Sequence, residues 1–274
     1  MYYICIYKCE TQLCIMNPFS VKTYRGPAYF IDREKETAKL LDAIRNERNL
    51  TLFSHRRFGK TMLIHHVFTK LDHRGFQPVV VDIFATRNMV HFAQKLTEVL
   101  YERKIINESW LHKLLGSLGA SMSFDPISGN PQISFSLVNR DRINQGLSDL
   151  FKQIVRTKKT VVIAFDEFQE VAKYTEPGFE KRLRSFIQQH SRICYIFSGS
   201  QKHLITEMFN ANNRAFYKSA ESFPLHRIET RNYIPWVQSL FSRKNVHLPA
   251  ELIEEIVARF ENHPMYIQNF LFPI

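Results

Sequence analysis

The segment that most constrains this chain is residues 54–61, SHRRFGKT, which stand between a short apolar run at 50–53 and a helical pattern that begins at Met62. A strand, a loop ending in GKT and a helix form a phosphate-binding loop. In such a loop the backbone N–H groups surround the β-phosphate, the lysine reaches the β/γ oxygens, and the following hydroxyl ligates Mg²⁺. We therefore expect Lys60 and Thr61 to fill these two roles.

The loop departs from the usual pattern GxxxxGK(S/T) at its first glycine, where this chain has Ser54. A backbone angle that only glycine tolerates is not available there, whereas the second glycine, Gly59, is intact. The alternative is a basic turn between a strand and a helix, in which GKT is accidental and the arginines are solvated. If the loop binds phosphate, the expected nucleotide contacts are Ser54, Arg56, Arg57, Phe58, Gly59, Lys60, Thr61 and Met62.

A second motif lies at residues 160–167, where the apolar run TVVIAF leads directly into Asp166 and Glu167. Adjacent carboxylates at the end of a buried strand suit Mg²⁺-assisted hydrolysis of a phosphoanhydride. We expect Asp166 to hold the water shell of the metal and Glu167 to polarise the attacking water. Another apolar strand, at 78–84, separates the two motifs in sequence, which indicates a P-loop fold of the additional-strand kind.

Helical and strand patterns alternate along the rest of the chain, which favours βαβ units and a mainly parallel sheet. The first helix is expected at 32–45, with Asp32 as its N-cap. Further helices are expected at 62–71, 88–104, 140–155 and 177–190, and further strands at 193–197 and 222–228. After the last strand the pattern is wholly helical, at 230–243, 249–261 and 264–272, which is typical of a small lid.

Two segments allow more than one interpretation. Residues 121–137 alternate with period two around the turn cluster DPISGNP, which predicts an inserted β-hairpin. It is either an addition to the edge of the sheet or an arm that contacts a partner. Residues 198–200, SGS, end the strand that follows the acidic strand. A hydroxyl there can sense the γ-phosphate, and a plain turn is the alternative.

Length and composition agree with a globular enzyme, because 274 residues with 45% hydrophobic side chains can bury a sizeable core. No apolar stretch approaches the roughly 20 residues of a membrane-spanning helix, so no membrane partner is expected. Cys5, Cys9 and Cys14 have spacings that match no zinc site, and a reduced, cytoplasmic protein is the simplest inference. Residues 1–15 precede Met16 as a tail that we expect to be an upstream extension contributing little to the fold.

Several motifs, taken together and in order, resemble the AAA+/STAND-like ATPases common in archaea and bacteria. They are HRRFGKT at 55–61, FDEFQEV at 165–171, FSGS at 197–200 and NHPMY at 262–266, preceded by YFIDREKE at 29–36. The resemblance implies a three-layer α/β/α core of the ASCE P-loop class at 16–228, with strand order 5-1-4-3-2 and with ATP and Mg²⁺ as cofactors. It also implies a helical lid at 229–274, shortened because the chain stops inside a lid helix.

The resemblance further implies roles for residues outside the two motifs. They are Ile31 and Arg33 near the adenine, Ser200 or Ser198 as the sensor, and His263 with Pro264 placing the lid against the nucleotide. From its position before the last strand, Arg214 could act as an arginine finger offered to a neighbouring subunit of a homo-oligomer. An arginine on a helix surface is the alternative.

The formal charge of +11 and the sequence pI near 9.5 indicate a polyanionic partner besides ATP, for which DNA is the obvious candidate. The basic residues are dispersed, with short clusters at 156–159 and 181–184, so a solvated basic surface is the alternative. Three functions remain: an ATPase switch that moves the lid or changes assembly, a poorly hydrolysing DNA-binding regulator, and a small-molecule kinase. The adjacent acids favour the first, the charge favours the second, and no acceptor site can be located for the third.

Overall fold

The computed structural model describes residues 17, 19, 23–118, 120–127, 129, 131–135, 139–190, 192–243 and 245–272. The tail at 1–15, with its three cysteines, lies outside the described residues. The chain divides into two compact units. The core unit is Arg33–His226, and the helical unit is Arg227–Ile274 together with the segment that ends at Asp32.

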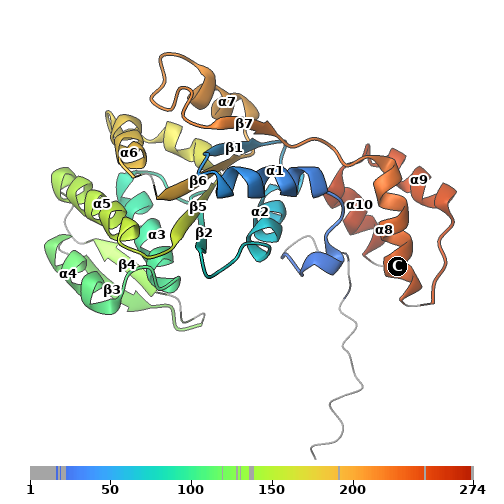
Figure 1. The fold of residues 1–274 in the computed structure, drawn as a ribbon, viewed down its shortest axis with the longest axis horizontal. Coiled ribbons are helices and arrows are strands. Elements are labelled where there is room, and N and C mark those ends of the chain that lie inside the picture. The colour runs from blue at the N-terminus through green and yellow to red at the C-terminus, as the bar shows by residue number, and fades with distance from the viewer. Residues whose placement is uncertain are drawn as a thin grey trace, which may run out of the picture. The chain divides into compact units, whose positions relative to one another are not determined.

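The core unit is built on a five-stranded sheet in the order β2-β5-β6-β1-β7, and every neighbouring pair is parallel (Figure 1). The strands are β1 Leu50–Phe53, β2 Phe76–Asp82, β5 Thr160–Asp166, β6 Ile193–Gly199 and β7 Glu221–Pro224. Numbered one to five along the chain and read from β7, they give the predicted order 5-1-4-3-2. The loop strand β1 therefore lies between β6 and β7, and β6 separates it from the acidic strand β5.

Continuous burial explains why the central strands carry unbroken apolar runs. Every position of β5 after the first is buried, as is every position of β6, which is typical of a parallel strand covered on both faces. On one face the rings of Phe165 and Phe197 stack with centroids 6.3 Å apart, and Phe168 meets Phe197 at 4.6 Å. Burying each such ring contributes roughly 1.5–3 kcal/mol, so the strand end that carries Asp166 is firmly anchored.

Helices cover both faces of this sheet (Figure 1). The helices α3 Met89–Glu102, α5 Arg140–Val155, α6 Phe179–Gln188 and α7 Lys202–Asn210 bury side chains in the cluster that contains Phe165. The helices α1 Glu34–Arg45 and α2 Lys60–Thr69 contact each other and bury side chains outside that cluster, which places them on the opposite face. This arrangement is the predicted three-layer α/β/α class.

Some local predictions are wrong. Asp32 does not cap α1, because the N-cap is Arg33 in a left-handed conformation (φ 78°) and no side chain bonds to the helix start. Instead, the Asp32 carboxylate accepts a hydrogen bond from the Asn232 side chain at 2.9 Å. The helix α4 Glu108–Leu118 was not predicted, although its buried residues Leu111, Leu114, Leu115 and Leu118 have helical spacing. The helix α7 and the short 3-10 helix η2 Phe168–Lys173 were also not predicted.

The predicted hairpin is present as β3 Ala120–Phe124 and β4 Pro131–Phe135, which pair antiparallel. It is not an addition to the edge of the main sheet, because the two strands form a separate sheet that contacts α3 and α4. The Ile133 backbone N–H donates to Oε1 of Glu98 on α3 at 3.0 Å. The apolar faces of these two helices therefore decide where the hairpin lies.

The helical unit contains the short 3-10 helix η1 Pro27–Tyr29 and the helices α8 Thr230–Ser242, α9 Ala250–Arg259 and α10 Pro264–Leu271. Its core is formed by side chains of all three α-helices together with Phe19 and Ile31. The Phe19 ring meets Trp236 edge-on, with centroids 5.6 Å apart. Among the helices that the structure describes, none combines the length and the apolar composition needed to cross a bilayer.

Candidate functional site

The loop between β1 and α2 leaves the start of α2 open toward an anion. Gly59 is the N-cap of α2 with φ 87°, a left-handed conformation that favours glycine. No side chain caps this helix, so no side chain occupies the N–H groups of its first turn, whose dipole favours negative charge. Ser54 has no positive φ, so the position of the missing first glycine does not require glycine.

Lys60 is a buried cation with weak partners. Its side chain lies under the loop, and Nζ donates to the His55 carbonyl at 3.3 Å and to Oγ and the carbonyl of Ser54 at 3.4 and 3.5 Å. These partners are neutral and the distances are long for hydrogen bonds. Burial lowers the pKa of the ammonium group, while Glu167 and Asp166 act in the opposite direction. A buried charge held this loosely fits an anionic ligand that would complete its coordination.

Thr61 connects the loop to the acidic strand. Its hydroxyl donates to Oδ2 of Asp166 at 2.6 Å, although the two residues are 105 positions apart. Both groups are hard oxygen donors of the kind that Mg²⁺ prefers. Among the described residues, no group of three or more His, Cys, Asp or Glu side chains is arranged so that it could hold a metal ion by itself. A metal bound here would therefore need phosphate oxygens and water as its other ligands.

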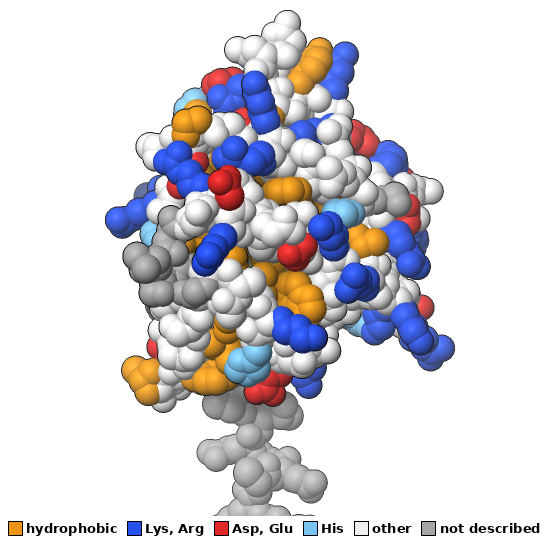
Figure 2. Space-filling view, turned by 90° about the vertical axis from the view of Figure 1, so that its left-hand side faces the viewer, with side chains coloured by type: hydrophobic (Ala, Val, Ile, Leu, Met, Phe, Trp, Pro, Cys, Tyr) orange, Lys and Arg blue, Asp and Glu red, His pale blue; other side chains and the backbone are white. Residues whose placement is uncertain are grey.

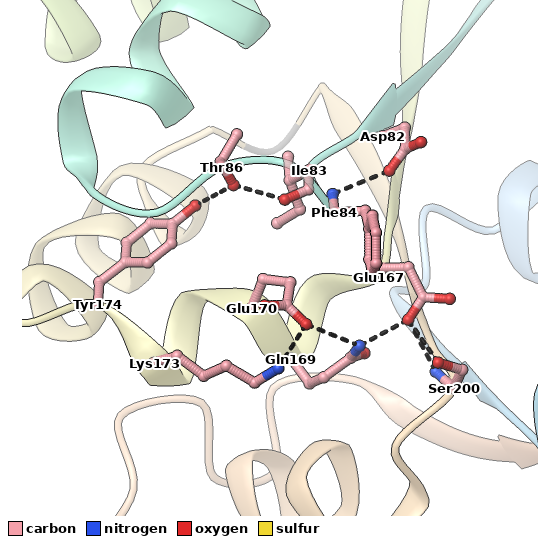
Figure 3. A network of polar contacts seen from close by, with 10 residues as sticks. All are labelled: Asp82, Ile83, Phe84, Thr86, Glu167, Gln169, Glu170, Lys173, Tyr174 and Ser200. Carbon is pink, nitrogen blue, oxygen red and sulfur yellow. Dashed lines mark hydrogen bonds and ion pairs between the residues drawn. The ribbon is translucent and has the colours of Figure 1, made fainter.

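Glu167 is held by three donors at the end of β5 (Figure 3). Its Oε2 accepts from the Ser200 hydroxyl at 2.6 Å, from the Ser200 backbone N–H at 3.3 Å and from Nε2 of Gln169 at 2.6 Å. The backbone of Glu167 is left-handed (φ 57°), an unusual conformation for a residue with a side chain, and one that is found often at functional sites. The carboxylate is thus fixed in direction by Ser200, at the end of the neighbouring strand β6, and by Gln169 of the 3-10 helix η2.

Gln169, which donates to that carboxylate, packs closely against Gly199. Gln169 is fully buried, and a Cβ on Gly199 would lie 2.7 Å from its Oε1. A side chain at 199 would therefore force the Gln169 amide to shift, so close approach rather than backbone angle favours glycine there. The network continues outward, because Gln169 also contacts Glu170, whose Oε1 accepts from Lys173 at 2.7 Å (Figure 3).

Asp82 is a third carboxylate at this edge, and sequence reasoning did not assign it a role. It ends β2 in register with Asp166 on β5. Partial burial raises the pKa of its carboxyl, the Phe84 backbone N–H opposes this, and the charges of Asp166 and Glu167 raise the pKa further. The sequence pattern that could have identified it is the same as for Asp166. Asp82 directly follows the apolar run at 78–81, just as Asp166 follows the apolar run at 160–165.

The structure brings some predicted residues together and leaves others apart. Ser200, and not Ser198, contacts Glu167, since Ser198 is buried within β6 and its hydroxyl has no partner among the described residues. In the loop, Arg56 and Arg57 are exposed, whereas Phe58 is buried with its ring 5.7 Å from that of His55. Met62, which follows Thr61 on α2, is half-buried.

The remaining predicted residues have structural partners of their own. Arg214 pairs with Glu180 and with Glu207, the latter at 3.4 Å. Arg33 is buried and donates to Glu36 and to the His226 carbonyl, each at 2.7 Å. Ile31, His263 and Pro264 belong to the helical unit. Their contacts with a nucleotide, and the arginine-finger role of Arg214, stay predictions.

Residues 30–267 match a family described as an ATPase domain predominantly from Archaea. Among solved structures, the chain is similar to the Walker-type ATPase of Pyrococcus abyssi, with 18% identity, a TM-score of 0.64, and coverage of 93% of this chain and 70% of that one. It is also similar to the Aeropyrum pernix ORC1 protein in complex with DNA (14% identity, TM-score 0.61, coverage 93% and 62%). The chain is similar as well to the Aeropyrum pernix ORC2 protein in ADPNP–ADP complexes, with 13% identity, a TM-score of 0.61, and coverage of 93% of this chain and 64% of that one.

Because these identities are all below 25%, what the solved structures establish is the shared fold alone. The chain spans less than two thirds of the length of the two Aeropyrum pernix proteins. A search of curated protein sequences finds no match.

Proposed function

The chain belongs to the family of ATPase domains that come predominantly from Archaea, and on this premise we propose that it binds ATP with Mg²⁺ and acts as a nucleotide-dependent switch driven by hydrolysis. The observation that carries the proposal is the contact between Thr61 and Asp166 at 2.6 Å, next to the buried ammonium group of Lys60. A hydroxyl, a carboxylate and a cation at the start of an uncapped helix are the groups that a nucleoside triphosphate with its metal requires.

The residues at this position fit Mg²⁺. The Thr61 hydroxyl would be a direct ligand, and Asp166 would hold water bound to the metal. When bound, Mg²⁺ neutralises charge that develops on the phosphate oxygens. Lys60 would contribute a second positive charge to the phosphates, for which its loose contacts with Ser54 and His55 leave it available.

Glu167 is the group that we assign to activation of the attacking water. Its Oε2 accepts hydrogen bonds from Ser200 and Gln169, whereas Oε1 accepts none from a described residue, which leaves an acceptor for water. A general base of this kind typically contributes about 10²–10⁴-fold to a rate. Because the same carboxylate bonds Ser200 at the end of β6, the state of the nucleotide can influence the neighbouring strand end.

A second candidate function is an ATP-dependent regulator that binds nucleic acid and hydrolyses slowly. It is supported by the net charge of +11 and by the fold shared with a protein solved in complex with DNA. In either function Arg214, now paired with Glu180, could exchange partners on assembly with a second copy. The two functions differ in the rate at which bound ATP is hydrolysed.

Release of phosphate from ATP separates these functions. We expect the wild-type chain to release phosphate in the presence of Mg²⁺, and we expect EDTA to stop this release. The Lys60→Ala variant should release none, which would exclude a contaminating hydrolase as the source. Rapid release, with or without DNA, supports the hydrolytic switch, and ATP binding with little release under both conditions supports the regulator. ATP that neither binds nor turns over under either condition would contradict both.

A further inference from the structure

A second recess lies on the core unit, between α4 and α5. It has a volume of about 280 Å³ and is lined, among others, by Trp110, Lys113 and Ser117 of α4, by Lys152 of α5 and by Arg156, the C-cap of α5. The helices approach closely below it, because a Cβ on Gly146 would lie 3.0 Å from the Leu118 side chain. None of the lining residues belongs to the site formed by Lys60, Thr61 and Glu167.

The recess is positively charged. Lys113, Lys152 and Arg156 line it together with a single carboxylate, Asp149, whose Oδ1 accepts from Lys152 at 3.2 Å. Lys113 forms no ion pair with any described residue, and the guanidinium of Arg156 donates to one described side chain, Oε1 of Gln153, at 3.5 Å. Exposed ion pairs contribute about 0–1 kcal/mol to stability, so the fold does not require these cations here.

An aromatic side chain accompanies the cations. Trp110 is half-buried, packs against the main core and lines the recess. Figure 2 shows the side of the molecule on which α4 and α5 lie, where Lys and Arg side chains are more frequent than Asp and Glu. Cations beside an indole are the combination that binds nucleic-acid strands, since phosphates meet the charges and a base stacks on the ring.

The size of the recess selects the form of the nucleic acid. A volume of about 280 Å³ lies near the lower end of small-ligand sites and can admit one base, but not a double helix. In a duplex the base faces are stacked inside, so an indole that lines a recess cannot stack on them. A single strand can turn a base inward while its phosphates remain outside.

We propose that the recess between α4 and α5 binds single-stranded nucleic acid, with a base against Trp110 and phosphates at Lys113, Lys152 and Arg156. The proposal specifies the nucleic-acid partner of the proposed function, but it does not depend on hydrolysis. The binding is non-specific in sequence, because stacking and phosphate contacts do not distinguish bases.

The test uses fluorescence, because the chain has two tryptophans. Trp236→Phe leaves Trp110 as the only indole. Titration with a thymidine oligomer of about 12 nucleotides should quench this fluorescence saturably, and a duplex of equal length should bind more weakly. The affinity should fall with salt with a slope of about −2, from roughly −0.7 for each of three phosphate contacts.

Charge reversal then identifies the site. In the same background, Lys113→Glu with Lys152→Glu should weaken binding at least about tenfold and reduce the magnitude of the salt slope by roughly 0.7 for each lysine. The matched control, Lys35→Glu with Lys70→Glu, changes two exposed lysines elsewhere by the same charge and should retain most of the affinity. Far-UV circular dichroism confirms that both variants fold.

Equal weakening in the two double variants, stronger binding of the duplex, or oligomer binding that leaves Trp110 fluorescence unchanged would each overturn the inference. Lys60→Ala should bind the oligomer as the wild type does. A chain that hydrolyses ATP but does not bind the oligomer would refute this inference and leave the ATPase intact.

Discussion

The hydroxyl of Ser200 lies 2.6 Å from Oε2 of Glu167, so the end of β6 holds the carboxylate that follows β5. The Ser200 backbone N–H and the Gln169 side chain bond to the same oxygen. Hydrogen bonds to a charged acceptor contribute about 1.5–3 kcal/mol each. The direction of the candidate base is thus set by two strand ends that are neighbours only in the folded sheet.

Ser200→Ala should lower kcat roughly tenfold or more with little change in KM, because about 1.4 kcal/mol lost from the transition state is a factor of ten. Steady-state phosphate release measures both constants. Ser198→Ala is the matched control, since that hydroxyl is buried two residues earlier on the same strand without a described partner. Equal kcat for wild type and Ser200→Ala would show that Ser200 does not position Glu167.

Glu167→Gln should separate binding from hydrolysis. Glutamine keeps the volume and can still bond to water, but it cannot accept a proton, so we expect turnover to fall about 10²–10⁴-fold while ATP remains bound. Single-turnover assays and calorimetry on the same sample measure the two effects. If this variant hydrolyses ATP as fast as the wild type, Glu167 is not the base.

Asp166→Asn should behave differently, because it weakens the metal site as well as turnover. We expect the affinity for ATP in the presence of Mg²⁺ to fall toward the value measured in EDTA. Calorimetric titrations with and without Mg²⁺ measure how much the metal increases the affinity for ATP. Glu167→Gln is the control, in which this increase should be retained. An undiminished effect of Mg²⁺ on ATP affinity would place the metal away from Asp166.

Lys60→Ala should abolish ATP binding, because the loop loses the positive charge that lies under it. Lys70→Ala, at the exposed end of the same helix, is the control and should bind ATP normally. Calorimetry measures the affinity and thermal melting confirms the fold. ATP affinity that survives in Lys60→Ala would contradict the assignment of residues 54–61 as a phosphate-binding loop.

Gly199→Ala should destabilise the core unit, because its Cβ would lie 2.7 Å from Oε1 of the fully buried Gln169. Overpacking of this kind costs about 1–3 kcal/mol, and each kcal/mol lowers Tm by about 2–4 °C in a domain of this size. Gly116→Ala, on the exposed side of α4 with nothing within 4 Å, should instead stabilise by about 0.4–1 kcal/mol. Thermal melts of both variants test the pair, and a neutral Gly199→Ala would show that Gln169 can move.

Local pattern was sufficient for much of the fold. The helix at 140–155 was predicted with its observed bounds, because its apolar residues recur with helical spacing next to solvated ones. The strand that ends at Asp166 followed from an unbroken apolar run. The order of the sheet came from a family resemblance and not from the pattern. The helices α4 and α7, which carry no motif, were not predicted.

The sequence was sufficient to predict a loop with Lys60 and Thr61 and a strand that ends at Asp166, next to Glu167, because each lies in one continuous segment whose spacing is fixed by covalent geometry. Tertiary structure alone decided that Asp82 stands in register with Asp166, that Ser200 rather than Ser198 holds Glu167, and that Gly199 must admit Gln169. These relationships join segments far apart in the chain. They depend on which strands pair and on how the aromatic core packs, and local periodicity carries no information about either.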